Sequence, residues 1–148
     1  MKDVLGTFNQ IQKAYRKYCY QAVAPMGIRM SEMICILFLY NHDTQDTAHA
    51  IAEYSQLSPS MVSKSLERLR EQGYLSVQRD CNDNRLQHLR LTEKAAPVVD
   101  CLSQAQTYFI STIAQGISAE EFQHLVSLAE QMQKNLVENP QLSGDAPF

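Results

Sequence analysis

Apolar and polar positions repeat with two different periods along this chain. Between residues 47 and 72 the apolar positions recur every three or four residues, which predicts two helices joined by a short turn. Residues 74–91 alternate at every second position on both sides of a polar stretch, which predicts a β-hairpin. We therefore expect a fold that is mainly α-helical with one small β-hairpin, an α+β arrangement.

The second of these helices has clear signals at both ends. Ser58 is a favourable N-cap, and Pro59 fits the first helical position, where its missing N–H costs no hydrogen bond. Gly73 is expected to follow the helix in a left-handed conformation. The apolar stripe of the helix consists of Val62, Leu66 and Leu69. This face therefore belongs to the core, and the opposite face, with Ser60 and Lys64, is open to solvent.

The hairpin also has one apolar and one polar side. Residues 80–84 are rich in Asp and Asn, which suit a turn because their side chains bond the neighbouring backbone. Arg85 follows just beyond the tip, and His88 and Arg90 are expected to point outward. The inward residues are Leu75, Val77, Leu89 and Leu91. Helix, turn, helix and hairpin in this order predict a winged helix-turn-helix.

Two further helices are predicted before this motif. Residues 4–21 place apolar side chains at helical spacing, which predicts an amphipathic helix with a broad apolar face. Ser31 is expected to cap a short helix over residues 32–40 that is apolar nearly all round and therefore buried. Thr47 or Asp46 would then cap the first helix of the motif.

Two long amphipathic helices are predicted after the hairpin. Thr92 is expected to start the first, which ends at Gly116, and Ser118 with Glu121 forms a capping box that opens the second. Together they have more apolar surface than one chain can cover, so we expect them to form a dimer interface. Residues 139–148, with two prolines and a glycine, are expected to be a loose tail.

The hairpin carries residues that resemble a known family. Residues 79–85, followed by Arg90, Leu91 and Thr92, resemble the wing signature of the MarR family of transcriptional regulators. In that family an Asp braces an Arg that enters the DNA minor groove, and the matching pair here is Asp83 and Arg85. The residues Ser58, Pro59, Ser60 and Gly73 have matching spacings, and the resemblance extends over nearly the whole chain.

The chain departs from the family pattern at two positions. Gln56 lies in the turn where members often have Gly, and a left-handed Gln56 would carry a strain of about 1 kcal/mol. Asn84 replaces a basic residue that many members have on the wing, which removes a phosphate contact. The first departure concerns the geometry of the turn and the second the strength of DNA binding.

The resemblance implies a homodimer in which the N-terminal helix intertwines with the C-terminal helices of the partner. Within one domain, 1–148, residues 29–91 would form the DNA-binding lobe, with the helix-turn-helix at about 47–72 and the wing at 74–91. Residues 1–24 and 92–138 would form the helical dimerisation region. The dimer would bind a palindromic operator in double-stranded DNA, with repression as the default outcome.

A recognition helix enters the major groove with its N-terminal half nearest the bases. The expected contacts on this helix come from Ser58, Ser60, Ser63, Lys64 and Arg68, of which Arg68 holds phosphate. The expected contacts on the wing come from Arg79, Asp83, Asn84 and Arg85. Half-sites about one helical turn apart would suit a two-fold dimer.

The net charge of −3 becomes informative when it is divided along the chain. From Ser58 to Arg90 six Lys and Arg residues face four Asp and Glu residues, a net charge of +2. Residues 1–57 are neutral, and residues 91–148 carry −5. The positive excess therefore lies on the helix and wing, and DNA binding should be sensitive to salt.

Several other classes of protein are disfavoured by the sequence. No nucleophile and base pair, carboxylate dyad or glycine-rich phosphate loop is present, so neither an enzyme nor a bound cofactor is expected. His42, Asp43, Asp46 and His49 are possible ligand types, but they lack the spacing of a metal site. No segment reaches the roughly 18 apolar residues of a membrane span, and no signal-peptide pattern follows Met1, so we expect a cytoplasmic protein without a membrane partner.

What controls DNA binding is open to two interpretations. The family resemblance implies release by a small aromatic or phenolic compound bound between the dimer helices and the winged lobe. Tyr15 and Tyr18 are weak candidates for that pocket, and the core and rim of a dimer are the favoured role for them. The second interpretation is thiol sensing by Cys19, whose sequence neighbours Arg16 and Lys17 favour a thiolate.

The other three cysteines are weaker candidates for sensing. No two of the four cysteines form a CxxC pair, so reduced thiols are expected. Cys81 is expected to be exposed on the wing, and Cys35 and Cys101 to lie in the core. An alternative of another class is a winged-helix protein-interaction module that does not bind DNA, in which Lys64, Arg68 and Arg85 would only solvate the surface. Salt-dependent DNA binding that is lost in Arg85→Ala separates this module from a regulator.

Overall fold

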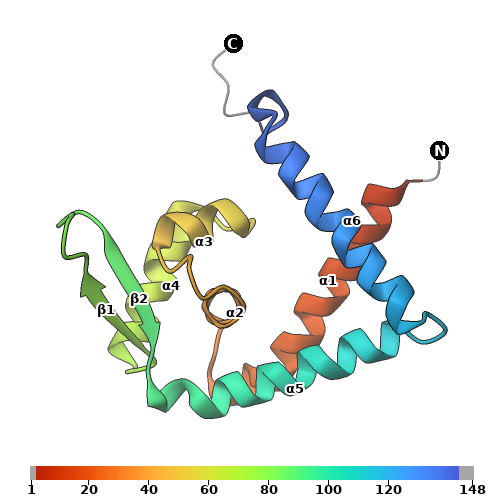
Figure 1. Cartoon of the computed structure of the whole chain (residues 1–148). Coiled ribbons are helices and arrows are strands. Elements are labelled where there is room, and N and C mark those ends of the chain that lie inside the picture. The colour runs from red at the N-terminus through yellow and green to blue at the C-terminus, as the bar shows by residue number, and fades with distance from the viewer. Residues whose placement is uncertain (1–2, 144–148) are drawn as a thin grey trace. The chain divides into compact units, whose positions relative to one another are not determined.

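The computed structural model of the chain describes residues 3–143. Its long helices are α1 (Val4–Val23), α2 (Met30–Asn41), α3 (Ala48–Tyr54), α4 (Pro59–Glu71), α5 (Ala96–Ile113) and α6 (Ala119–Val137). The strands are β1 (Leu75–Arg79) and β2 (Gln87–Leu91), and short 3-10 turns lie at Ala24–Met26, Glu93–Ala95 and Pro140–Leu142. The predicted fold class is confirmed: mainly helical, with a two-stranded antiparallel hairpin (Figure 1).

The chain divides into two compact units, Met1–Phe109 and Ile110–Phe148. The first contains α1 to α4, the hairpin and most of α5. The second contains the end of α5 and the whole of α6. No residue of α6 is buried. The predicted tail begins with a 3-10 turn at Pro140–Leu142, and its residues 144–148 lie outside the described residues.

The helix α2 forms the centre of the core in the first unit. Seven consecutive residues, Glu32 to Phe38, are buried, which confirms that this helix is buried on all sides (α2 is seen end-on in Figure 1). It packs against α1, α4 and β2. Its Met33 and Ile36 are among the largest buried side chains of the chain, as are Ile51, Leu69 and Leu102 from other elements. The helix-turn-helix is therefore built on a rigid apolar base.

The start of α2 differs from the prediction. Its N-cap is Arg29 and not Ser31, because Glu32 accepts the backbone N–H of Arg29 through Oε2 at 2.9 Å. Ser31 is the second residue of the helix, and its hydroxyl accepts a hydrogen bond from Ser65 at 2.9 Å. A serine before an apolar helix was the wrong signal here, since the acid beside it caps from inside the helix.

The helix-turn-helix follows the sequence signals closely. Thr47, and not Asp46, caps α3 by accepting the Ala50 N–H at 3.2 Å. In the turn, Gln56 is not left-handed, because among residues 3–143 only glycines have positive φ. The strain considered for Gln56 is therefore absent. Gly73 is left-handed at φ 82°, and Tyr74 N–H reaches Leu69 O at 2.9 Å, which closes α4 in the predicted way.

The hairpin is paired in the predicted register. Leu75 lies opposite Leu91 and Val77 opposite Leu89, so the apolar residues of both strands share one face. At its base Thr92 donates from Oγ1 to Gly73 O at 2.6 Å, which ties the end of the hairpin to the end of α4. Thr92 precedes a 3-10 turn, and α5 begins only at Ala96, four residues later than predicted.

Within the described residues, no single helix is both long enough and apolar enough to cross a membrane. Only α1 with its following turn, taken together with α2, reaches that length and composition, and the two are bent by 107°. Most of α2 is buried in the core, which accounts for its composition.

Candidate DNA-binding surface

The first half of α4 offers a set of exposed polar side chains. Ser58 holds the start of the helix, since its Oγ accepts the Met61 N–H at 3.2 Å. Ser60, Ser63 and Lys64 are exposed on the next turns, as predicted from the helical period. Because Ser58 is occupied as a cap, the groups that remain free to bind another molecule are those of the next turn.

Arg68 lies in a different environment from Lys64. Its Nε donates to Oε1 of Glu32 at 2.5 Å, and Glu32 is 0% exposed whereas the Arg68 side chain is 36% exposed. A buried carboxylate needs such a partner, because an unpaired charge in the core is costly. Arg68 therefore joins α4 to α2, a role that the sequence analysis did not assign to it.

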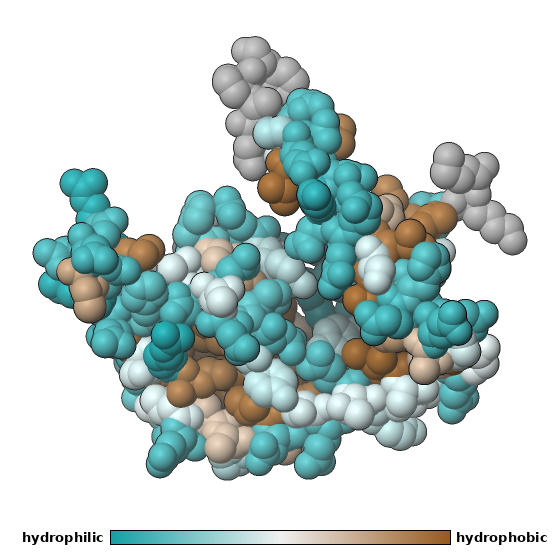
Figure 2. All heavy atoms as spheres, in the orientation of Figure 1, coloured by the Kyte–Doolittle hydropathy of each residue, from teal (hydrophilic) through white to brown (hydrophobic). Residues whose placement is uncertain are grey.

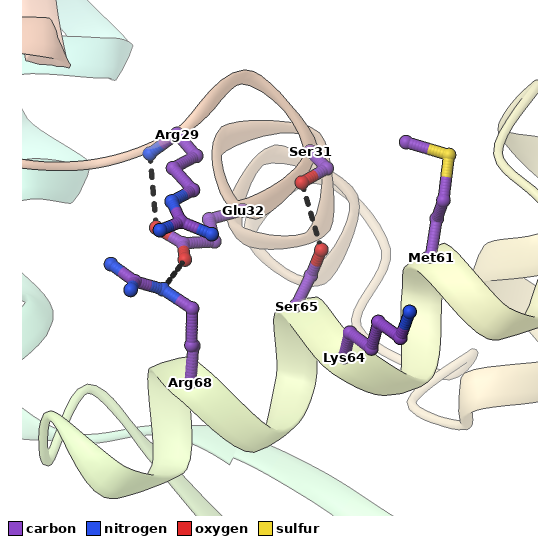
Figure 3. Close-up of a pocket in the computed structure, with 7 residues that line it drawn as sticks. All are labelled: Arg29, Ser31, Glu32, Met61, Lys64, Ser65 and Arg68. Carbon is purple, nitrogen blue, oxygen red and sulfur yellow. Dashed lines mark hydrogen bonds and ion pairs between the residues drawn. The ribbon is translucent and has the colours of Figure 1, made fainter.

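A pocket of about 170 Å³ lies between the start of α2 and α4. Its lining consists of Arg29, Ser31, Glu32, Met61, Lys64, Ser65 and Arg68, and Figure 3 shows Arg29 and Arg68 on either side of the Glu32 carboxylate. Lys64 and Met61 border the pocket from α4, one turn nearer its N-terminus. The pocket combines three cationic side chains with one carboxylate, two hydroxyls and one apolar thioether.

The loop of the wing is held by its own aspartates. Asp80 Oδ1 accepts the backbone N–H groups of Asn82 at 2.7 Å and Asp83 at 3.2 Å. Asp83 Oδ1 in turn accepts the Arg85 backbone N–H at 3.0 Å. Asp83 thus braces the backbone of Arg85, and within residues 3–143 the Arg85 guanidinium has no ion-pair partner. Arg79 ends β1, and Arg79, Asn84 and Arg85 are all exposed.

An imidazole bridge joins the wing to the loop before α3. His88 Nδ1 lies 2.7 Å from Asp46 Oδ1, and His88 Nε2 lies 2.8 Å from Asp80 Oδ2. Arg90 completes the group through Asp46 Oδ2 at 3.1 Å. The alternation of the strand predicts His88 on the outer face but does not predict this bridge, because Asp46 is 42 residues away and no spacing rule connects them.

Residues 26–86 match the family model of the MarR family. This part of the chain, the winged helix-turn-helix lobe, belongs to that family. The matched residues include α2, the helix-turn-helix and β1, and end beside Arg85 in the wing loop. The resemblance found in the sequence is therefore confirmed, and with it the class of a DNA-binding transcriptional regulator. Proteins of the MarR family are regulators and not enzymes.

Solved structures of MarR-family regulators have the same fold. One from Silicibacter pomeroyi matches with a TM-score of 0.75 and 20% identity over 88% of this chain and 87% of that chain. Another, from Listeria monocytogenes and complexed with 26mer DNA, matches with a TM-score of 0.81 and 14% identity over 100% of this chain and 99% of that chain. A mutant of S. aureus MepR bound to an oligodeoxyribonucleotide matches with a TM-score of 0.57 and 20% identity over 92% of this chain and 99% of that chain.

The tyrosines considered for an effector pocket pack against other rings in this MarR-family chain. Tyr15 meets Phe109 edge-on at 5.4 Å between ring centroids, and Tyr18 stacks on Tyr108 at 6.0 Å. Burial is the largest influence on Tyr15 and raises its pKa well above the ordinary value. These contacts show the rings packing between α1 and α5 within one chain.

Cys19 lies in an environment that opposes thiol chemistry. It is 0% exposed, and burial raises the pKa of its thiol, while a hydrogen bond with Tyr15 has a smaller, lowering effect. The expectation that Arg16 and Lys17 would favour a thiolate was wrong, because burial dominates. Cys35 is buried as predicted, Cys101 is only partly buried, and Cys81 is exposed on the wing.

The polar loop before α3 has structural roles. His42 stacks on Phe38 at 4.3 Å between ring centroids, and its Nδ1 lies 2.9 Å from the Phe38 carbonyl oxygen. His49 pairs with Glu53 on the surface of α3 at 3.1 Å. With Asp46 engaged by His88 and Arg90, these side chains are divided among separate interactions.

Proposed function

We propose that this MarR-family chain acts as a homodimer that binds an inverted-repeat operator and represses transcription until a small aromatic ligand releases it. The observation that carries this proposal is the wing: Asp80 and Asp83 order the loop through its backbone and leave the Arg85 guanidinium unpaired within the described residues. An unpaired arginine on an ordered loop suits the narrow, strongly negative minor groove of A·T-rich DNA.

The recognition helix would supply the major-groove contacts. Ser60, Ser63 and Lys64 are exposed on the first turns of α4, where side chains of such helices reach base edges. Lys64 can bind guanine or phosphate, and the serines can bind a base or the backbone. The structures from L. monocytogenes and S. aureus contain DNA, which supports the same use of this fold here. Such a regulator works where the chromosome lies, in the cytoplasm.

Arg68 is a weaker phosphate ligand than the sequence analysis assumed. Its Nε is committed to Glu32, so only the outer part of its guanidinium is free to face DNA. Its main contribution would be to hold the recognition helix in place. Arg79, at the loop end of β1, and Asn84, in the wing loop, are exposed and remain suited to phosphate contacts.

Dimerisation is supported by apolar side chains that one chain leaves uncovered. On α6 these are Leu125, Leu128, Met132 and Leu136, and on α1 they are Val4, Leu5, Phe8 and Ile11. Figure 2 shows apolar side chains at the surface along α6. Exposed apolar stripes of this length usually mark an interface. A second copy of the chain would bury them and would set the two recognition helices on one face of DNA.

The pocket beside α4 is the best-suited place for an effector. Three cationic residues, Arg29, Lys64 and Arg68, border it, and an aromatic carboxylate would find both charge and an apolar wall there. An occupant would engage Lys64 and so oppose DNA binding. A ligand can shift the equilibrium only by its different affinity for the free and DNA-bound forms. This pocket replaces Tyr15 and Tyr18 as the proposed site, since those rings pack against others.

The proposal is tested by retardation of the DNA just upstream of the gene for this chain, between about 50 and 200 mM salt. We expect tight, salt-sensitive binding, weakened about tenfold or more in Arg85→Ala. Lys134→Ala, which removes the same charge from α6, is the matched control and should bind normally. Binding to no duplex, including a random pool, would favour the protein-interaction module instead.

The effector is tested in the same assay. Salicylate should release the wild-type complex, and Arg29→Ala, which alters the pocket without touching α4, should require more of it. Tyr18→Ala should respond like the wild type. The alternative regulator, a thiol sensor using Cys19, would be favoured if peroxide alone released the DNA and Cys19→Ser abolished that release.

A further inference from the structure

The bridge formed by Asp46, His88 and Asp80 joins three parts of the DNA-binding lobe. His88 is on β2, Asp80 begins the wing loop, and Asp46 precedes α3. Asp46 also accepts the Leu89 backbone N–H through its own carbonyl oxygen at 2.8 Å. The loop before α3 is therefore attached to β2 by both backbone and side chain, and His88 extends that attachment to the wing loop.

The geometry of the bridge determines how many protons the His88 imidazole carries. Each imidazole nitrogen lies within 2.8 Å of a carboxylate oxygen, so both nitrogens must donate. Neutral imidazole has one N–H, and its other nitrogen presents a lone pair that a carboxylate oxygen would repel. Only the imidazolium satisfies both contacts at once.

Both carboxylates also interact with other donors. Asp46 pairs with Arg90, and Asp80 accepts two backbone N–H groups of the wing loop, which together with His88 lower the pKa of Asp80. The hydrogen bonds to Asp46 and then to Asp80 raise the pKa of His88 above its ordinary value, against a smaller effect of desolvation. The extra proton of the group therefore belongs to His88.

The surrounding charges are few. The charged groups facing the imidazole are Asp46 and Asp80, and Arg90 reaches the group through Asp46. The helix α2 also packs on β2, and its carboxylate, Glu32, is paired with Arg68. When His88 is protonated, its charge and those of Asp46, Asp80 and Arg90 sum to zero. When His88 is neutral, one of the two carboxylates loses its hydrogen-bond donor.

We propose that His88 is the positioning residue of the wing, and that its protonation fixes the loop bearing Arg85 for DNA binding and makes that binding weaken as pH rises. This proposal rests on the proposed DNA-binding function of the wing. When His88 loses its proton, it keeps a hydrogen bond to only one of the two carboxylates. Either Asp80 is released, which frees the loop, or Asp46 is released, which frees the wing from the loop before α3.

The expected size of the effect follows from the fraction of protonated molecules. If only the protonated form holds the wing correctly, the apparent Kd is the intrinsic Kd divided by that fraction. Binding would then be independent of pH well below the pKa of His88. It would weaken by up to about tenfold for each pH unit above it.

The first measurement uses the full-length wild-type protein without DNA. A series of NMR spectra between pH 5 and 9 follows the His88 ring and the backbone amides of Asn82, Asp83 and Arg85. We expect the ring to titrate above about pH 6.5, the ordinary histidine value. The three wing amides should shift with the same midpoint. If the Arg85 amide does not follow His88, the proposal is overturned.

The second measurement is duplex affinity over the same pH range at constant salt. His88→Gln should bind at all pH values like the deprotonated wild type, with a flat profile. His124→Gln removes a histidine from α6 and should keep the wild-type profile. DNA binding that varies equally with pH in wild type and His88→Gln would overturn this inference and leave the proposed function intact. Absence of binding even at pH 6 would instead overturn the proposed function, and the NMR titration would still decide whether His88 orders the wing.

Discussion

Arg68 of the recognition helix donates from Nε to Oε1 of Glu32 over 2.5 Å, and this contact joins the DNA-binding surface to the centre of the core. Glu32 is fully buried and accepts one further hydrogen bond, from the Arg29 backbone N–H at 2.9 Å. Arg68 is 36% exposed and could be solvated without its partner. Glu32 therefore needs Arg68 as a partner more than Arg68 needs Glu32.

This asymmetry predicts that Arg68→Ala destabilises the protein more than Glu32→Gln. Removing Arg68 leaves a buried carboxylate without its counter-charge, which costs about 3 kcal/mol of unfolding free energy. Glu32→Gln keeps an acceptor for Arg29 and leaves Arg68 partly hydrated, at a cost of about 1 to 2 kcal/mol. Urea unfolding gives both values, with Arg70→Ala as a control that removes an exposed charge from the same helix. A larger loss of unfolding free energy in Glu32→Gln than in Arg68→Ala would contradict this prediction.

The contact between Asp83 and Arg85 predicts a different outcome for two substitutions of one residue. Asp83 accepts a backbone N–H, and the side-chain carbonyl of Asn can accept it equally well. Asp83→Asn should therefore retain DNA affinity, whereas Asp83→Ala should weaken it about two- to tenfold by loosening the turn, the loss expected of one hydrogen bond. Fluorescence anisotropy with a labelled duplex measures both. Equal losses in the two variants would mean that Asp83 acts through its charge on the guanidinium.

The local sequence signals predicted most of the DNA-binding lobe. Ser58, Pro59 and Gly73 act on backbone within a few residues of themselves, so their effects can be predicted without tertiary contacts. The same holds for the hairpin, whose period of two fixes which residues share a face. Where two local signals competed, at Ser31 and Glu32, the acid at the third helical position determined the cap.

The features that the sequence did not predict depend on residues far apart in the chain. Glu32 and Arg68 are separated by 36 residues, and Asp46 and His88 by 42. A charged residue in an otherwise apolar helix indicates that a partner exists, and Glu32 could have been recognised in this way. The identity of that partner could not have been predicted, since the sequence offers several arginines. For Cys19 the sequence neighbours were misleading, because burial by distant residues outweighs nearby charges.

The exposed apolar stripe on α6 predicts that one charge placed within it will separate a dimer. Met132 is 57% exposed, so Met132→Glu should fold normally but should lose self-association, because a dimer would bury two unpaired carboxylates. Gln123→Glu adds the same charge outside the stripe and serves as the control. Light scattering after gel filtration gives the mass, with one chain at 16.8 kDa. A wild-type mass of one chain would remove dimerisation from the proposed function.

The environments of the cysteines predict their order of reaction with an alkylating reagent. Cys81 is exposed on the wing and should be modified first, whereas Cys19 and Cys35 are buried, with burial raising the pKa of both thiols. Because the thiolate is the reactive form, these two should react only after unfolding. Mass spectrometry of peptides after brief treatment with iodoacetamide gives the order, and Cys81→Ser shows whether the second site is then modified faster. Early modification of Cys19 in the native protein would restore it as a candidate sensor.

The bridge at His88 predicts a pH dependence of stability in addition to that of DNA binding. The pKa of His88 is raised in the folded protein, so its contribution is complete below about pH 6.5 and is lost as pH rises through the folded value. The pKa of Asp80 is lowered, first by the Asn82 N–H and then by His88, so its contribution is present above about pH 4 and is lost as pH falls through the folded value.

The difference in Tm between wild type and His88→Gln should therefore be largest between about pH 4 and 6.5 and should shrink at higher pH. Differential scanning calorimetry from pH 4 to 9 measures this difference, and its change with pH is informative even if the substitution also has a constant cost. His124→Gln controls for the loss of a histidine, because His124 has no carboxylate partner among residues 3–143. A wild-type advantage that grew above pH 7 would mean that neutral His88, and not the imidazolium, stabilises the wing.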